Sequence, residues 1–314
     1  MRILLMLLLF SACEVEAQPS KGQVYYFNEN WKKIDKNEAK FFRIVGDYIP
    51  ELNVYNAVDY FISGEKYSEG TYDWPETGFA HGTIRYFYKS GEVKKEVKFS
   101  KSKAIGNFKE WYKNGDLKLL GVYEANPKEP RRENILKIMS YWNENRVQTV
   151  LHGSGEYFEC DDVQNICQDG TLKSGLKEGV WNGLDKENNI NFNDLYKKGV
   201  FVKGASTDEM NNQYKYSEIR TKPTVKGGEE NFSFYILRKI DKAYKKSNFE
   251  GKVYISFIVT EDEKIMNFDF IGNSNFDLKD EVSSVLKDGP EWRAGTFRGK
   301  KVKTQVILPL TFHH

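Results

Sequence analysis

Three stretches near the C-terminus alternate between apolar and polar residues with a period of two, namely 251–260, 264–271 and 302–312. Successive side chains of a β-strand point to opposite faces of its sheet, so this alternation predicts three strands that each bury one face. The residues expected on the buried faces are Val253, Ile255, Phe257, Val259, Met266, Phe268, Phe270, Val302, Thr304, Val306, Leu308, Leu310 and Phe312.

Two neighbouring stretches instead place their apolar residues three to four positions apart, which is the spacing of an α-helix with one buried face. Together with the strands, they predict an α+β domain over residues 223–314, in the order helix, strand, strand, helix, strand. The apolar residues of the two helices are Phe232, Tyr235, Ile236, Ile240 and Tyr244 in the first, and Leu278, Val282, Val285 and Leu286 in the second.

Residues 55–204 contain a short motif that recurs at intervals of about 25 residues. Each copy has two aromatic residues, two further residues, a glycine and an acidic residue, with the glycines at Gly64, Gly91 and Gly115. A degraded fourth copy lies at 141–145, where Asn145 takes the place of glycine and can adopt the same left-handed conformation. Tight turns of this kind join two strands, so each copy predicts a β-hairpin.

One hairpin cannot bury its aromatic face alone, so neighbouring hairpins are expected to stack side by side. The repeats resemble MORN-type repeats. The resemblance implies an elongated antiparallel β-sheet of hairpin repeats over residues 18–204. The polar residues 205–222 are expected to form a linker. The fold class predicted for the whole chain is therefore mainly β, followed by an α+β domain.

The last segment, 223–314, resembles the C-terminal domain of the TonB family. The resemblance rests on Gly227-Gly228 before the first helix, on Gly251-Lys-Val opening the first strand, on 278–286, and on Trp292-Arg-Ala-Gly before the closing strand. It implies a TonB-like α-β-β-α-β domain. Two turn positions depart from the family pattern, since Lys245 replaces the usual Pro and Glu263 the usual Gly.

In that family the last strand lies at the edge of the sheet, and an extended peptide from an outer-membrane receptor adds to it. Pro309 has no N–H group, so its nitrogen is expected to face the free edge. By alternation, Lys303, Gln305 and Ile307 expose their backbone groups at the same edge, which makes them the predicted peptide-binding residues. Alternatively, Pro309 protects the edge from aggregation, or a second copy of the chain covers it in a homodimer.

The N-terminus has the pattern of a secretory signal peptide, with Arg2 followed by an apolar run that is too short to span a bilayer. Cleavage is expected after Ala17, which places the mature protein in the periplasm of a Gram-negative cell. The sequence before Cys13 resembles a lipoprotein box, so the alternative is a lipid anchor on Cys13.

Cys160 and Cys167 are the other cysteines, and an oxidising compartment favours a disulfide between them. The chain-entropy estimate for so short a loop is roughly 2–3 kcal/mol of stabilisation. The four histidines do not lie at metal-ligand spacing, so no metal site is predicted. Asp161 and Asp162 are interpreted as a solvated loop, since further oxygen ligands for calcium are lacking at suitable spacing.

The sequence contains no nucleophile motif, Walker loop or dinucleotide-binding fingerprint. A net charge of +2 gives no field that would attract nucleic acid. We therefore expect a protein without enzymatic activity, cofactor, small-molecule substrate or nucleic-acid partner.

The function expected is recognition of an extended peptide of an envelope partner, such as an outer-membrane receptor, by edge-strand addition. One alternative is a structural or interaction repeat protein of the cell envelope, in which aromatic residues of the sheet bind sugar or peptide or simply pack together. Another is a component of a TonB-dependent transmembrane transport complex. TonB transducers carry an uncleaved anchor and a Pro-rich spacer, whereas this chain has only 8 Pro.

Overall fold

The computed structural model describes residues 19–77, 79–126, 133–161, 164–246, 249–272, 278–287 and 289–312. The expected signal segment, with Cys13 and Ala17, lies outside the described residues, as does Asp162. The chain divides into two units. One comprises Met1–Gly155 with Ser174–Leu176, and the other comprises Glu156–Lys173 with Lys177–His314.

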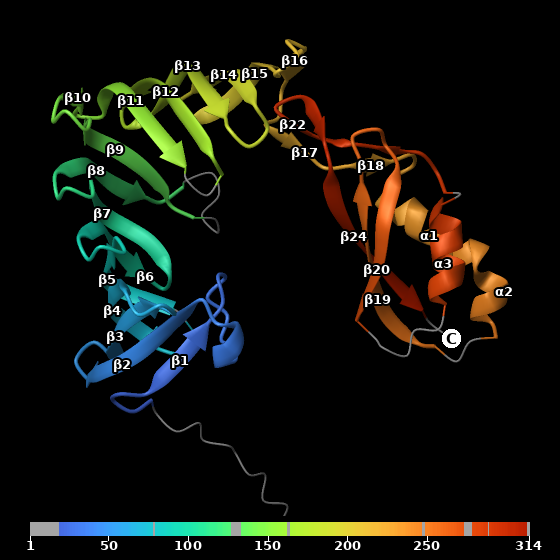
Figure 1. Cartoon of the computed structure of the whole chain (residues 1–314), viewed down its shortest axis with the longest axis horizontal. Coiled ribbons are helices and arrows are strands. Elements are labelled where there is room, and N and C mark those ends of the chain that lie inside the picture. The colour runs from blue at the N-terminus through green and yellow to red at the C-terminus, as the bar shows by residue number, and fades with distance from the viewer. Residues whose placement is uncertain are drawn as a thin grey trace, which may run out of the picture. The chain divides into compact units, whose positions relative to one another are not determined.

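A 16-stranded antiparallel sheet contains β1 to β16, and each strand pairs with its neighbours in sequence (Figure 1). The fold is therefore mainly β, as predicted. A 3-10 helix, Lys36–Glu38, follows β1. The strands are β1 Val24–Phe27, β2 Phe41–Ile49, β3 Val54–Phe61, β4 Lys66–Trp74, β5 Phe79–Phe87, β6 Val93–Ser100, β7 Lys103–Trp111, β8 Leu117–Glu124, β9 Ile135–Trp142, β10 Gln148–Leu151, β11 Ser154–Asp161, β12 Ile166–Lys173, β13 Leu176–Asp185, β14 Ile190–Lys197, β15 Val200–Thr207 and β16 Gln213–Tyr216.

The repeated motif forms a five-residue turn. In the copy at 88–92, the N–H of Tyr88 donates to the C=O of Glu92, the N–H of Gly91 donates to the C=O of Tyr88, and Gly91 has a φ of 102°. The same pair of hydrogen bonds, with a positive φ at the fourth residue, occurs at 28–32, 61–65, 112–116, 143–147, 208–212 and 260–264. In the fourth predicted copy, the left-handed residue is Arg146 and not Asn145, because the turn begins one residue later than the sequence pattern indicates.

Two glycines near the end of the sheet, Gly183 and Gly204, lie beneath aromatic rings of the next strand. A Cβ atom on Gly183 would lie 2.1 Å from a ring carbon of Phe192, and one on Gly204 would lie 2.4 Å from the ring of Tyr216. Phe192 and Tyr216 are directly opposite these glycines in the sheet register. At these two positions the missing side chain gives the ring a flat surface to pack on.

A different, two-residue turn of Lys198 and Gly199 joins β14 and β15, with φ values of 51° and 77°. Asparagine tolerates the left-handed conformation better than lysine and is preferred before glycine in such turns. We expect Lys198→Asn to raise the free energy of unfolding by about 0.5–1 kcal/mol, since asparagine relieves part of a left-handed strain of roughly 1–2 kcal/mol. Urea denaturation checks this. Lys197→Asn, on an exposed position of β14, is the control, and an equal gain there would contradict the explanation.

The segment 205–222, predicted to be an irregular linker, contains part of β15, the whole of β16, and β17 Arg220–Thr221. Tyr216 explains why this segment joins the sheet. Its ring packs on Gly204, and its hydroxyl donates a hydrogen bond to the buried carboxylate of Asp194. A polar segment can therefore extend the sheet by a single well-placed aromatic side chain.

The C-terminal residues form helices and three small sheets, with strand orders β17-β22-β23, β18-β21 and β20-β19-β24 (Figure 1). The stretch predicted as one helix with Phe232 and Tyr244 on the same face forms two helices, Glu229–Lys239 and Asp241–Tyr244. The elements are β18 Thr224–Val225, α1 Glu229–Lys239, α2 Asp241–Tyr244, β19 Gly251–Val259, β20 Ile265–Gly272, α3 Lys279–Lys287, β21 Trp292–Arg293, β22 Gly295–Phe297, β23 Lys300–Val302 and β24 Thr304–Phe312.

One hydrophobic core joins the helices to the sheet β20-β19-β24. Most residues predicted to be buried there are at most 4% exposed. Trp292 lies edge-on to Phe232 of α1 and to Phe257 of β19, with ring centroids 5.3 and 5.1 Å apart. The buried members of this core are Val225, Phe232, Ile236, Ile240, Phe249, Val253, Ile255, Phe257, Val259, Leu278, Val282, Leu286, Trp292, Leu308, Leu310 and Phe312.

The face predicted for Met266 is wrong. The register of β20 against β19 shifts between Ser256 and Ile258, and Asn267 has a φ of 56°. This bulge reverses the alternation, so Phe268 and Phe270 pack against the core while Met266 is 39% exposed on the open face of the sheet.

Candidate functional site

The backbone register places an unpaired edge along β24. Pro309 lies opposite Tyr254 of β19, and because Pro309 has no N–H, the two cannot form a hydrogen-bonded pair. Opposed residues alternate between bonded and non-bonded pairs. Ile307, opposite Ser256, and Gln305 therefore also direct their N–H and C=O groups away from β19. No other strand of the described chain pairs with this side of β24.

Lys303, the third residue predicted to line this edge, does not belong to the strand. Residues 300–302 form β23, which pairs with β22, and the chain passes to the other sheet at Lys303 before β24 begins at Thr304. The expected single strand 302–312 is thus two strands. The edge along β24 comprises Gln305, Ile307, Pro309 and Thr311 and excludes Lys303.

The side chains of the two remaining predicted residues differ in their environment. The Gln305 amide Nε2 donates a 2.7 Å hydrogen bond to the hydroxyl of Ser256, which is only 4% exposed. Ile307 is 53% exposed. A substitution of Gln305 therefore disturbs a contact between β24 and β19, whereas a substitution of Ile307 alters the surface alone.

The opposite edge of the same sheet is less suitable for pairing. The bulge at Asn267 interrupts β20 near its middle, whereas β24 pairs with β19 over nine consecutive residues without a register shift. Bulges are a common way for proteins to prevent an edge strand from accepting another strand. The regular edge of β24 is the one that can accept an extended peptide.

Apolar side chains from all three strands lie exposed on the open face of this sheet. Tyr254, Met266, Ile271 and Ile307 are between 38% and 53% exposed. A strand added beside β24 would extend this face next to Ile307.

The β22–β23 hairpin directly precedes β24. Arg298 fixes it to the end of the 16-stranded sheet, which is called the repeat sheet below. Its guanidinium forms an ion pair with Asp194 of β14 and lies 3.2 Å from the ring centre of Phe192. Ser206 of β15 donates a 2.6 Å hydrogen bond to the C=O of Arg298. Both charged side chains are at most 4% exposed, so this contact is a buried polar anchor.

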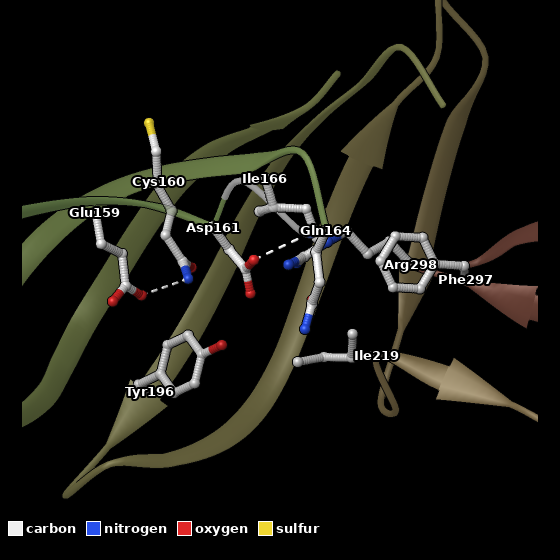
Figure 2. A pocket seen from close by; sticks show the side chains of 10 residues that line it. Glu159, Cys160, Asp161, Gln164, Ile166, Tyr196, Ile219, Phe297 and Arg298 are labelled. Carbon is white, nitrogen blue, oxygen red and sulfur yellow. Dashed lines mark hydrogen bonds between the residues drawn. The ribbon is translucent and has the colours of Figure 1, made fainter. Parts of the chain in front are cut away.

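A pocket of about 310 Å³ lies beside this anchor, between the β11–β12 hairpin and the β22–β23 hairpin (Figure 2). Figure 2 shows the Asp161 carboxylate and the Tyr196 hydroxyl turned toward its centre. Asp161 accepts a hydrogen bond from the N–H of Gln164, and Glu159 accepts hydrogen bonds from Gln168 and Lys177. Ile166 and Phe297 supply the apolar wall.

Cys160 and Cys167 form a disulfide with an S–S distance of 2.10 Å. It links β11 to β12 next to the turn of the hairpin that borders this pocket. The link restrains the position of Ile166, which packs in the same cluster as Phe297. Burial raises the pKa of Tyr196 to about 12. The phenol stays protonated at neutral pH and can donate a hydrogen bond.

Within the described part of the chain, no group of His, Cys, Asp and Glu side chains is arranged to hold a metal ion. None of the described helices combines the length and the hydrophobicity needed to cross a bilayer.

Sequence reasoning missed Asp194, Phe192 and Arg298, which hold the hairpin that leads into β24. Their only signals in the sequence are an Arg-Gly turn before the last strand and an Asp between aromatic residues of β14. Neither signal predicts that residues 104 positions apart meet.

The chain matches no protein-family model, and no curated protein matches it in sequence.

Proposed function

We propose that this protein is an exported, non-enzymatic binding protein whose residues 223–314 form a TonB-like domain. The domain recognises an extended peptide of an envelope partner, such as an outer-membrane receptor, by adding it as a strand beside β24. The order α1, β19, β20, α3, β24 supports the TonB-like assignment. The signal-like residues 1–17 support export to the periplasm.

The observation that carries the proposal is the regular outer edge of β24. Gln305, Ile307 and Thr311 offer N–H donors there, and Pro309 offers a C=O acceptor, while the opposite edge of the sheet is interrupted at Asn267. The added strand extends the sheet past the exposed apolar side chain of Ile307, which favours a peptide with an apolar residue at the neighbouring position.

The expected affinity is modest. About six ladder hydrogen bonds at about 0.5–1.5 kcal/mol each contribute roughly 3–9 kcal/mol. Association costs at least about 4 kcal/mol in lost translational and rotational freedom. Backbone pairing alone therefore gives a weak and transient complex, and contacts of the peptide side chains must supply the specificity.

We expect Ile307→Pro to weaken peptide binding at least tenfold, because it removes an outward N–H from the middle of the edge and places a ring in the path of the added strand. That N–H takes no part in the pairing with β19, so the midpoint of thermal unfolding should change little. The measurement is an NMR titration of the whole mature chain with peptides from the periplasmic segments of outer-membrane receptors. Shifts should be confined to β24 and β19.

Ile307→Thr is the matched control, since it keeps the N–H and should retain binding. Gln305→Pro is a less specific test, because it also removes the hydrogen bond to Ser256. The proposal is wrong if the wild-type chain binds none of the peptides, or if Ile307→Pro binds them as the wild type does. Collapse of stability in Ile307→Pro would show that this side of β24 is not free.

A further inference from the structure

The repeat sheet has a second pocket, far from β24 in the sequence, with a volume of about 150 Å³. Five aromatic side chains contribute to its lining: Trp31, Tyr67, Tyr72, Tyr86 and Phe99. They come from successive hairpins and contact one another, with Tyr67 lying 5.5 Å from Trp31 and 5.7 Å from Tyr86 between ring centres. Aromatic rings therefore supply half of the ten residues that line the pocket.

The charged groups of this pocket are satisfied within the protein. Arg43 and Asp59 are 1% and 0% exposed, and the Arg43 Nε donates a 2.6 Å hydrogen bond to Asp59. Ser68 and Tyr72 each donate a 2.7 Å hydrogen bond to the same carboxylate. The guanidinium also stacks on Tyr72, 3.5 Å from its ring centre. Since the two charges cancel, the pocket favours a neutral ligand over a charged one.

Hydrogen-bonding capacity remains at the wall of the pocket. The phenol hydroxyls of Tyr67 and Tyr86 form no hydrogen bond with any described residue, and both side chains are half-buried. Burial raises the pKa of both phenols, so they stay protonated and can donate as well as accept. The hydroxyl of Ser102, which also lines the pocket, lacks a partner among the described residues. A purely apolar ligand would leave these groups without partners.

The size of the pocket limits the part of a ligand that lies inside it to one ring, because a protein cavity of about 150 Å³ holds a single six-membered ring. We propose that this pocket binds one neutral pyranose ring of a carbohydrate. The apolar C–H face of the sugar packs on the aromatic wall, and its hydroxyls bond to Tyr67 and Tyr86. A pyranose combines the three properties that the pocket selects: one ring, no charge, and hydroxyl groups around an apolar face. This site is independent of the β24 edge.

The test is an NMR titration of the whole mature chain with four neutral probes: methyl β-D-glucoside, methyl β-D-galactoside, methyl α-D-mannoside and N-acetylglucosamine. We expect at least one to bind, with shifts around Trp31, Tyr67 and Tyr86. Tyr86→Phe keeps the ring and removes the hydroxyl, so it should weaken that binding about three- to tenfold. Tyr67→Phe should act in the same direction.

Tyr60→Phe is the control, because Tyr60 stacks on Phe42 on the other face of the sheet. It should bind the sugar like the wild type. Phenol and glucuronate serve as comparison ligands of similar ring size. The proposal is overturned if none of the four sugars binds, if phenol binds at this pocket and the sugars do not, or if glucuronate binds as well as the neutral sugars. It is also overturned if both Tyr→Phe variants bind a sugar unchanged while circular dichroism shows them folded.

Discussion

Asp194→Ala is expected to lower the free energy of unfolding by about 3–5 kcal/mol, the range measured when one partner of a buried ion pair is removed. Asp194 is 0% exposed and Arg298 is 4% exposed, so the substitution leaves an uncompensated guanidinium inside the protein. It also removes the acceptor of the Tyr216 hydroxyl. Urea denaturation of the whole chain, followed by circular dichroism, measures the loss.

Glu96→Ala is the matched control. Glu96 forms an ion pair with Arg85 on the same sheet, but the two side chains are 27% and 47% exposed. Water already solvates these charges, so the expected loss is at most about 1 kcal/mol. If Asp194→Ala costs no more than Glu96→Ala, the guanidinium of Arg298 reaches solvent in the native protein, and the buried anchor does not exist as described.

Several features of the fold could be predicted from the sequence because they depend on local pattern. Alternation located β19 and β24 to within about two residues, and aromatic–glycine spacing located the hairpins β3–β4, β5–β6 and β7–β8. The turns at Gly64, Gly91 and Gly115 adopt the left-handed conformation that glycine allows most readily.

Other features could not be predicted because they depend on contacts between distant residues. Lys303 follows the alternation of a strand residue, yet it lies between β23, which pairs with β22, and β24, which pairs with β19. Asn267 gives no sign in the sequence of the bulge that moves Met266 to the open face. Arg43 and Asp59 are charged residues that a sequence pattern assigns to the surface, but the sheet register places them directly opposite each other in the interior.

The candidate site likewise has one part that could be predicted before the structure and one part that depends on contacts between distant residues. The prediction of a free edge along β24 rests on the resemblance of residues 223–314 to the TonB C-terminal domain, while the missing donor of Pro309 indicates which side of the strand is free. The anchor that positions the preceding hairpin requires Asp194 and Arg298 to meet across 104 residues. Only one of its parts, the Arg-Gly turn, has a local signature.

Gly183→Ala is expected to lower the free energy of unfolding by about 2–4 kcal/mol, at the upper end of the cost of overpacking a core. The new methyl group would lie 2.1 Å from the ring of Phe192, which is only 2% exposed. The ring cannot move freely, because the guanidinium of Arg298 lies 3.2 Å from its centre. Gly46→Ala is the control with a smaller expected loss, since its closest neighbours are 3.1 Å away.

The losses in the free energy of unfolding caused by Asp194→Ala and by Gly183→Ala should not be additive. Moving Phe192 displaces Arg298, so Gly183→Ala already weakens the ion pair that Asp194→Ala removes. The double variant is therefore expected to lose less stability than the sum of the two single losses, by about 1 kcal/mol or more. Urea denaturation of all four proteins in this cycle measures the difference. Full additivity would show that Phe192 yields without disturbing Arg298, and that the glycine and the ion pair stabilise the sheet independently.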